Sequence, residues 1–231
     1  MKRMKILVIY GQSHKGTTYT ITQILLNKLN GDVKEVFLPR DFHEFCIGCA
    51  QCIYQDEKLC PHYKELQPIT EMIDEADLLI FASPVYVFHT TGAMKSLLDH
   101  YGWRWMIHRP SPDMFRKQAV VIVTAAGAGM KSAIKDISDS LFYWGIARTY
   151  RFGIAVYADS YEHMSDKKKR KTVRALDRIA GKITAAEHPV PPLKTRLFFR
   201  FYRRFILRRM QENDQLYYRT HGLMDTLPWK C

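Results

Sequence analysis

Four of the five cysteines of the chain fall within one short segment, FCIGCAQCIYQDEKLCPHY, which spans residues 45–63. They are Cys46, Cys49, Cys52 and Cys60, whereas Cys231 is terminal and is assigned no role. Thiolates this close together can ligate an iron–sulfur cluster, hold a zinc ion or cycle as a redox disulfide. They can also belong to a loop without a cofactor, so the segment alone leaves four alternatives open.

The composition of the chain indicates the class of protein and the cellular compartment in which these cysteines occur. The 231 residues are 47% hydrophobic and 25% charged, which is typical of a globular chain with a real core. The apolar run near the N-terminus is short and leads into a polar turn, which does not indicate a signal peptide. No stretch approaches the roughly 18 apolar residues of a membrane-spanning helix. We therefore expect a soluble, cytoplasmic protein, a setting in which clustered cysteines more often serve metal or redox chemistry.

The elements that must position these residues alternate along the chain. Short apolar runs predict strands over residues 5–10, 33–38, 77–82, 119–124 and 151–157. Helical periodicity follows them over residues 17–29, 65–75, 91–101, 131–144 and 166–186. Because right-handed crossovers place helices on both faces of a parallel sheet, this alternation predicts a doubly wound α/β fold.

In such a sheet the ligand binds outside the carboxyl ends of the strands. The loop after the first strand, GQSHKGTTYT, carries Ser13, Lys15, Gly16, Thr17 and Thr18 at or just before a helix start. Hydroxyls, amides and a helix N-terminus favour an anion, which predicts a phosphate cradle. A capped strand-to-helix turn is the plainer alternative. The loop has neither the G-x-x-x-x-G-K-[ST] nor the G-x-G-x-x-G pattern, which disfavours an NTPase or a dinucleotide-binding domain.

Two further loops should lie at the same edge of the sheet. After the third strand, in SPVYVFH, Pro84 fixes the backbone while Tyr86 and Phe88 supply aromatic surface for a flat ring. After the fourth strand, the small residues of 125–129 let a ligand edge approach the backbone closely. Together the three loops predict a phosphate site, a ring-stacking turn and a close backbone rim.

The ordered set GQSHKGTT, CIGCAQC with Cys60, ADLLIFASPVYVFHTTGAMKSLLD and VTAAGAG resembles the flavodoxin-like NADPH-dependent FMN reductase family, including its iron–sulfur flavoprotein branch. The match covers roughly residues 4–186, and its most specific part is the S-P-V-Y turn followed by a helix with Lys95 and Asp99. The resemblance implies a five-stranded parallel sheet in the order 2-1-3-4-5. It also implies noncovalently bound FMN, with NAD(P)H as the electron donor.

The resemblance implies roles for individual residues as well. At the FMN phosphate it places Ser13, Lys15, Gly16, Thr17 and Thr18. Beside the ring it places Pro84, Val85, Tyr86 and Val87, and at the pyrimidine edge Ala125 and Gly127. It names no catalytic acid or base, and Tyr86 and His89 are only neighbours of the expected site.

The cysteine spacing is also similar to the ligand motif of the iron–sulfur flavoproteins. This similarity makes Cys46, Cys49, Cys52 and Cys60 candidate ligands of a 4Fe–4S cluster, with cycling or free thiols and zinc still open. His62 can substitute as a ligand, although an exposed loop position is the plainer expectation. Because the segment follows the second strand, we expect the thiols near the FMN of the same chain or of a partner subunit.

The last part of the chain differs in composition from the rest. Residues 191–231 follow a proline-rich break and form a predicted basic helical tail, separate from an FMN-binding domain over residues 1–190. Nine Lys and Arg against three Asp and Glu give the tail a net charge of +6, half of the +12 of the chain. Helical spacing predicts an apolar face of Phe198, Phe201, Tyr202, Phe205 and Ile206 and a basic face of Arg196, Arg200, Arg203 and Arg204.

Such a tail can pack on its own domain, contact a second copy or lie on an anionic membrane. No recognised motif accompanies the charge, which disfavours nucleic acid. The sequence thus predicts an FMN-dependent oxidoreductase that passes electrons from NAD(P)H or a protein donor to a small-molecule or protein acceptor. We expect it to form a homo-oligomer. The alternative is a non-enzymatic, flavodoxin-like electron carrier whose basic tail docks a redox partner.

Overall fold

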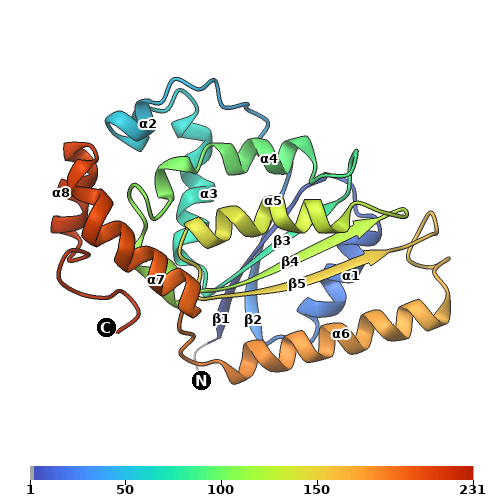
Figure 1. Ribbon diagram of the computed structural model, residues 1–231. Helices are drawn as coiled ribbons and strands as arrows, with labels where there is room; N and C mark the ends of the chain where they lie inside the picture. Colours follow the sequence, from blue (N-terminus) through green and yellow to red (C-terminus); the bar gives the residue numbers. More distant parts are fainter. Residues whose placement is uncertain (1–2, 231) are drawn as a thin grey trace.

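The computed structural model describes residues 3–230, so Met1, Lys2 and Cys231 lie outside it. Its centre is a sheet of five parallel strands in the order β2-β1-β3-β4-β5 (Figure 1). The strands are β1 (Met4–Tyr10), β2 (Gly31–Phe37), β3 (Leu78–Pro84), β4 (Gln118–Ala125) and β5 (Arg148–Ala155). The predicted α/β fold and its strand order 2-1-3-4-5 are confirmed.

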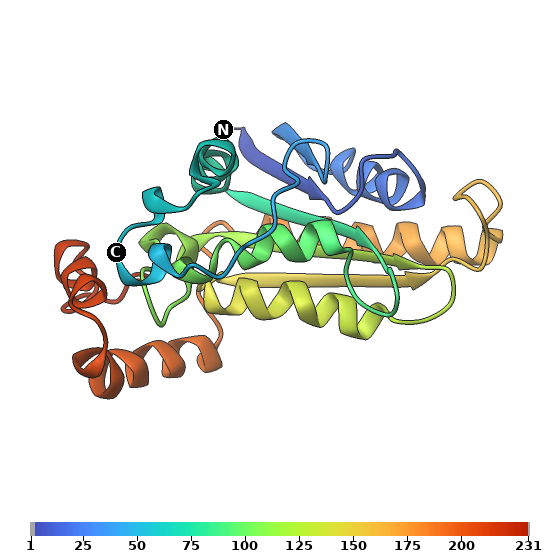
Figure 2. The same ribbon diagram turned by 90° about the horizontal axis from the view of Figure 1, so that it is seen from above.

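Helices cover both faces of this sheet (Figures 1 and 2). One face carries α1 (Thr17–Leu26) and α6 (Asp166–Ala185). The other carries α3 (Tyr63–Glu75), α4 (Gly92–Asp99) and α5 (Met130–Tyr143). This arrangement creates two cores, one on each side of the sheet.

The strand sequences follow from this double covering. Leu7 and Ile9 of β1 pack in the core under α3, α4 and α5, whereas Ile6 and Val8 pack in the core under α1 and α6. Because successive side chains of a strand point to opposite faces, a strand covered on both sides must be apolar throughout. Every residue of β4 is buried for this reason.

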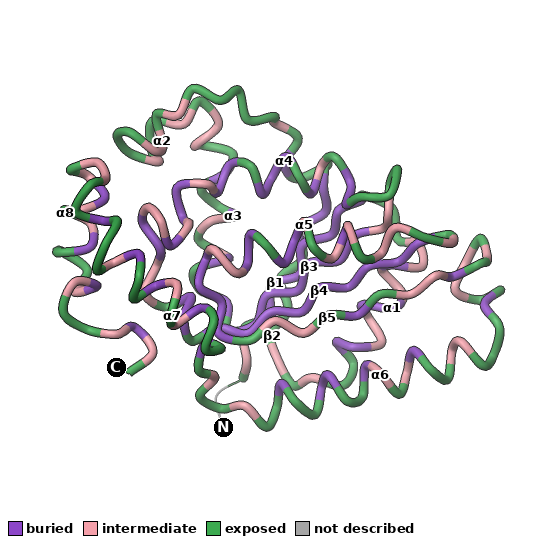
Figure 3. Tube along the Cα trace, in the orientation of Figure 1, coloured by how far each residue is buried: buried purple, intermediate pink, exposed green. Residues whose placement is uncertain are grey.

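The segment between β2 and α3 has little regular structure. It contains the four-residue helix α2 (Gln51–Tyr54) and a 3₁₀ turn over Glu57–Leu59. From the end of β2 the chain runs back over the face that carries α4, toward the opposite end of the molecule (Figure 2). Most of residues 39–62 is exposed or half-buried (Figure 3).

The tail folds as α7 (Leu193–Phe201), a π turn (Tyr202–Ile206), a 3₁₀ turn (Leu207–Arg209) and α8 (Glu212–Thr220). It packs against the connection between α4 and β4 in a third apolar cluster, whose buried members are Met106, Phe115, Phe199, Tyr202, Leu207, Tyr218 and Leu223. Within residues 3–230, no helix combines the length and apolar content that a membrane crossing requires. The division of the chain at residue 190 stays a prediction.

The predicted apolar face of the tail is only partly right. The structure buries Phe199 and Tyr202, whereas Phe201 and Phe205 remain 54% and 59% exposed. The π turn wraps one more residue into a turn than an α-helix does, so it changes which side chains share a face. Phe199 lies in α7, before the π turn, and is buried at regular helical spacing with Tyr202, so the predicted face also had the wrong phase.

Candidate functional site

The three loops predicted to bind a ligand lie together at the carboxyl ends of β1, β3 and β4 (Figure 1). The second and third loops are in direct contact, because the Val85 N–H donates to the Thr124 carbonyl at 2.7 Å. Gly129, with φ 93°, lies so close that a Cβ there would be 2.7 Å from Val85 Cγ1. The loop after β4 needs its glycine for this close approach.

The first loop leads into α1 and leaves the start of that helix open to an anion. Gly16 is the N-cap residue, no side chain caps the helix, and its first turn carries no acidic residue. The N–H groups of the first turn lack helical partners and attract negative charge. Thr17 is half-buried in this turn, and the exposed Lys15 places its ammonium 5.1 Å from the centre of the Tyr19 ring.

Ser13 and Thr18 use their hydroxyls elsewhere in this structure. The Ser13 hydroxyl donates to the Leu38 carbonyl at 3.2 Å and accepts from the Arg40 N–H at 3.3 Å. The Thr18 hydroxyl is buried and lies 2.7 Å from that of Thr124 in β4. These contacts brace the loop against β2 and β4, and direct phosphate contacts by Ser13 and Thr18 stay predictions.

The turn after β3 is strained and apolar. Tyr86 and His89 close it with two backbone hydrogen bonds of 3.0 and 3.1 Å, so that Val87 and Phe88 take φ values of 47° and 67°. Positive φ is rare for a β-branched residue and costs roughly 1–2 kcal/mol. All three apolar side chains of the turn are exposed, Val87 by 92%. Exposed apolar groups on a strained backbone are typical of a surface that a ligand covers.

Tyr157 joins the site and is not among the site residues predicted from the sequence. It lies two residues after the end of β5, and its N–H donates to the Ala126 carbonyl at 2.9 Å. Its hydroxyl donates to the Gly127 carbonyl at 3.3 Å, and the Lys168 ammonium lies 3.9 Å from the ring centre. Applying the carboxyl-end rule to the fifth strand as well would have identified this exposed ring. His89, which was expected only as a neighbour of the site, has its Nδ1 3.0 Å from Oδ2 of Asp136.

The four clustered cysteines line one cavity of about 200 Å³, together with residues from the end of α4. All four are free thiols. Burial, followed by repulsion from the neighbouring Cys60, Cys46 and Cys49, raises the pKa of Cys52 to about 11. A metal centre reverses this penalty because its charge stabilises the thiolates. Four thiols around one cavity therefore fit an iron–sulfur cluster as a donor set.

Two histidines extend the donor set of this cavity. His62 is half-buried rather than exposed, and its Nδ1 lies 2.9 Å from Nε2 of His100, whose Nδ1 lies 2.8 Å from the Ser96 carbonyl. The Cys60 sulfur and one nitrogen of each histidine lie within 4.8 Å of one another. Burial lowers the pKa of His100, which favours the neutral form that binds metals. No motif in the sequence indicated His100 as a ligand, and a zinc site on these three groups stays open.

The cavity does not lie beside the loops after β1, β3 and β4, where the FMN of the same chain is expected. The expectation that the thiols lie near the FMN of their own chain was therefore wrong. Its wall includes Asp99, His100 and Gly102 at the C-terminal end of α4, whereas the loop after β1 and the end of β3 meet Thr91 at the N-terminal end. The eight residues of α4 separate the two ends by about 12 Å. The reason is the path of the chain, which leaves β2 and turns back along this face (Figure 2). Proximity to the FMN of a partner subunit stays a prediction.

A protein-family model and several curated proteins match this chain. The family model for NADPH-dependent FMN reductase matches residues 4–156. An iron–sulfur flavoprotein from Archaeoglobus fulgidus is 28% identical over 159 residues, covering 66% of this chain and 70% of the relative. An iron–sulfur flavoprotein from Methanocaldococcus jannaschii is 27% identical over 142 residues, which cover 59% of this chain and 70% of the relative.

Among solved structures, an NAD(P)H:quinone oxidoreductase from Methanothermobacter marburgensis superimposes with a TM-score of 0.61. The superposition covers 78% of this chain and 96% of that chain at 14% identity, so this likeness shows the fold alone. The family match spans all four clustered cysteines and the loops after β1, β3 and β4. The chain belongs to the NADPH-dependent FMN reductase family and is an FMN-dependent oxidoreductase.

Proposed function

We propose that this oxidoreductase passes electrons from NAD(P)H, through FMN and a 4Fe–4S cluster, to a small-molecule or protein acceptor. The ligands of the cluster are Cys46, Cys49, Cys52 and Cys60. The observation that carries the proposal is the single cavity of about 200 Å³ that all four residues line. The names of the iron–sulfur flavoproteins similar to this chain support it. FMN supplies the exchange between a two-electron donor and a one-electron centre.

The flavin site is built from the three loops. Lys15, Gly16 and Thr17 bind the phosphate with the first-turn amides of α1, while Ser13 and Thr18 brace the loop and complete the cradle. The ring lies against the turn after β3, where Pro84, Val85, Tyr86 and Val87 cover it. Ala125 and Gly127 meet its pyrimidine edge, and the exposed rings of Phe88 and Tyr157 exclude water from its rim.

Because the cavity is separated from the flavin loops of its own chain, the proposal includes a homo-oligomer in which FMN and the cluster of different subunits lie close together. Phe45 and Ile47, beside the cysteines, are exposed, as are Val87 and Phe88 at the flavin loops. Apolar groups at both places are suited to burial against a second copy. In such an assembly the cavity of one subunit faces the flavin of its partner. Light scattering that reports only monomers at working concentration would contradict this arrangement.

The outer face of the tail suits the surface of an anionic membrane on the cytoplasmic side. Large apolar side chains recur there every four residues and stay exposed, at Leu193, Leu197, Phe201 and Phe205. Residues 193–210 contain seven Lys and Arg and no acidic residue. Leu197→Glu with Phe201→Glu should abolish binding to anionic vesicles but leave the oligomeric mass unchanged. A change of mass without any vesicle binding by the native chain would assign this face to a second copy instead.

The cluster is tested on protein purified without oxygen. We expect flavin and iron–sulfur absorption together, with about four iron and four sulfide per chain. Cys49→Ser should remove the iron and sulfide and retain the flavin, whereas Cys231→Ser should change neither. Protein that binds FMN but contains no iron would overturn the cluster. A thiol count that differs between oxidised and reduced samples would then favour cycling thiols, and stoichiometric zinc would favour the Cys60 and histidine site.

The electron donor is tested by steady-state oxidation of NADH and NADPH with a quinone or free flavin as acceptor. We expect turnover with at least one of the two nucleotides. An absence of turnover with both, in protein that retains FMN, would favour a protein donor.

A further inference from the structure

Helix α2, which carries Cys52, is too short to be stable alone. It has four residues, and its N-cap residue Ala50 has φ 56° and provides no side-chain cap. Isolated helices of this length do not form, because nucleation is unfavourable. The last carbonyls of a helix also lack helical partners. The position of Cys52 therefore depends on groups outside α2.

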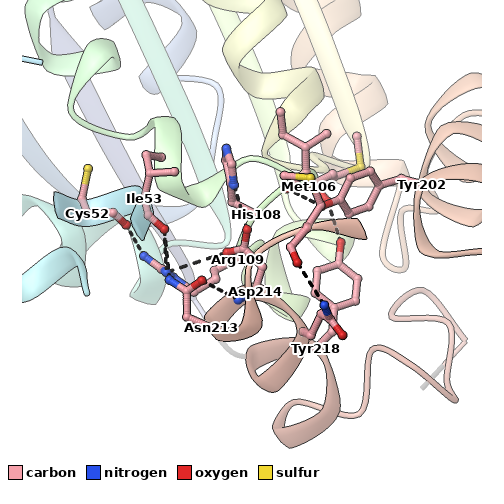
Figure 4. Close-up of polar contacts among 12 residues, drawn as sticks. Cys52, Ile53, Met106, His108, Arg109, Tyr202, Asn213, Asp214 and Tyr218 are labelled. Atoms are coloured by element: carbon pink, nitrogen blue, oxygen red, sulfur yellow. Dashed lines mark hydrogen bonds and ion pairs between the residues drawn. The ribbon is translucent and has the colours of Figure 1, made fainter. Parts of the chain in front are cut away.

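Two side chains from distant parts of the chain bind these carbonyls (Figure 4). Asn213 of α8 donates from Nδ2 to the Ile53 carbonyl at 3.0 Å and to the Gln55 carbonyl at 3.1 Å. Arg109 donates from Nη1 to the Gln55 carbonyl at 3.3 Å and from Nη2 to the carbonyl of Cys52 itself. A cation and an amide thus form an external C-terminal cap on α2.

The tail also holds Arg109 in place. Arg109 is only 5% exposed, and its Nη1 lies 3.8 Å from Oδ1 of Asp214, which is fully buried in α8. The other Asp214 oxygen lies 3.0 Å from Nδ1 of His108. Glu57 adds a second carboxylate 3.5 Å from Nη2 of Arg109. Undocking α8 would separate the buried Asp214 from both Arg109 and His108, so the docked tail stabilises this arrangement, and Glu57 adds to it from outside the tail.

Tail hydroxyls fix the backbone on either side of Arg109 (Figure 4). Tyr218 donates to the Met106 carbonyl, Tyr202 to that of Ile107 and Tyr217 to that of Pro110. Their rings pack in or against the third apolar cluster. Contacts therefore run without interruption from the tail, through residues 106–110, to the carbonyl of Cys52.

We propose that the C-terminal tail is a positioning element for the cysteine cavity. Asn213 and Arg109 cap α2, Asp214 orients Arg109, and the cap holds Cys52 in the cavity wall. These are positioning residues, because they act through the backbone of α2. The inference rests on the proposed function only for what the cavity binds, since the capping contacts involve no metal.

The first test measures amide hydrogen exchange in the iron-free, full-length protein. Asn213→Ala removes both hydrogen bonds to α2. Asn213→Asp removes the donor but keeps the oxygen that accepts the Asp214 N–H at 2.9 Å. Both variants should speed exchange at the amides of Ile53, Tyr54 and Gln55 by about 10- to 30-fold. The matched control is Leu216→Ala, an exposed position on α8, which should match the native chain.

The second test uses the iron-loaded protein and a chelator. Both Asn213 variants should lose iron–sulfur absorption at least several-fold faster than Leu216→Ala and retain their flavin absorption. A merely structural role would release flavin and iron together. Exchange at α2 equal to that of the control, or parallel loss of both chromophores, would overturn the inference. If the protein takes up no iron, the proposed cluster is refuted, but the hydrogen-exchange test still decides whether Asn213 stabilises α2.

Discussion

Replacing Val87 by glycine should stabilise the protein and weaken its binding of FMN. Val87 has φ 47° in the turn after β3, which costs roughly 1–2 kcal/mol for a side chain with a Cβ. Glycine removes this strain but adds roughly 0.5–1 kcal/mol of backbone entropy to the unfolded state. The side chain is 92% exposed, so its loss removes no packing from the flavin-free protein. The net gain in unfolding free energy is about 0.5–1 kcal/mol, or about 2 °C in Tm.

The same side chain should contribute to the flavin complex, because the proposed ring covers it. Burying a valine contributes about 1.5 kcal/mol, so Val87→Gly should raise the Kd for FMN about tenfold. Thermal unfolding of the flavin-free protein and fluorescence titration with FMN measure the two effects. Val190→Gly, at an exposed position outside the flavin loops and without positive φ, should lose stability and bind FMN normally. A less stable Val87→Gly with unchanged FMN affinity would refute the strain and the ring placement together.

Three further predictions concern charged groups. Lys15→Ala should raise the Kd for FMN tenfold or more, because a charge-assisted bond contributes about 1.5–3 kcal/mol; equal affinity by titration would remove Lys15 from the phosphate site. Asp74→Asn should lower the unfolding free energy in urea by about 2–3 kcal/mol, because it leaves the buried Arg104 without its carboxylate; a loss below 0.5 kcal/mol would contradict this. The hydrogen bond from Arg40 lowers the pKa of Asp41 in the folded protein below its ordinary value of 3.8. The stability that this bond contributes is therefore present above pH 3.8 and is lost as the pH falls through the pKa of the folded state. Asp41→Asn should therefore be about 1 kcal/mol less stable at pH 7 and equal to the native chain near pH 2, and a difference that persists at pH 2 would be inconsistent with this linkage.

The sheet was predictable because double covering imposes continuous apolar strands. The run from Leu78 to Ala82 and the run through β4 are buried throughout, so hydrophobicity alone locates them. The meeting of the loops after β1, β3 and β4 was predictable for a related reason, since the carboxyl ends of parallel strands lie at one edge. Local pattern and topology determine these features, and both can be read from the sequence.

The environment of the cysteines was not predictable, because it depends on contacts between distant segments. Nothing adjacent to Cys52 in the sequence indicates that Arg109 or Asn213 binds its helix. His100 reaches the cavity only because α4 ends there. The prediction for the tail was wrong for another reason: its apolar face omitted the buried Phe199, and the π turn over Tyr202–Ile206 changes the helical spacing of the residues after it.

The contact between Asn213 and Ile53 joins residues 160 positions apart, and this has a consequence for how the protein is made. Synthesis proceeds from the N-terminus at about 5–20 residues per second, so roughly 8–30 s pass between the appearance of the cysteine segment and that of its cap. During this interval the strands from β3 to β5 and Arg109 are synthesised, but Asn213 is not, so α2 has only the arginine half of its cap. We therefore expect the cysteine segment to be less well ordered in the nascent chain until α8 has been synthesised.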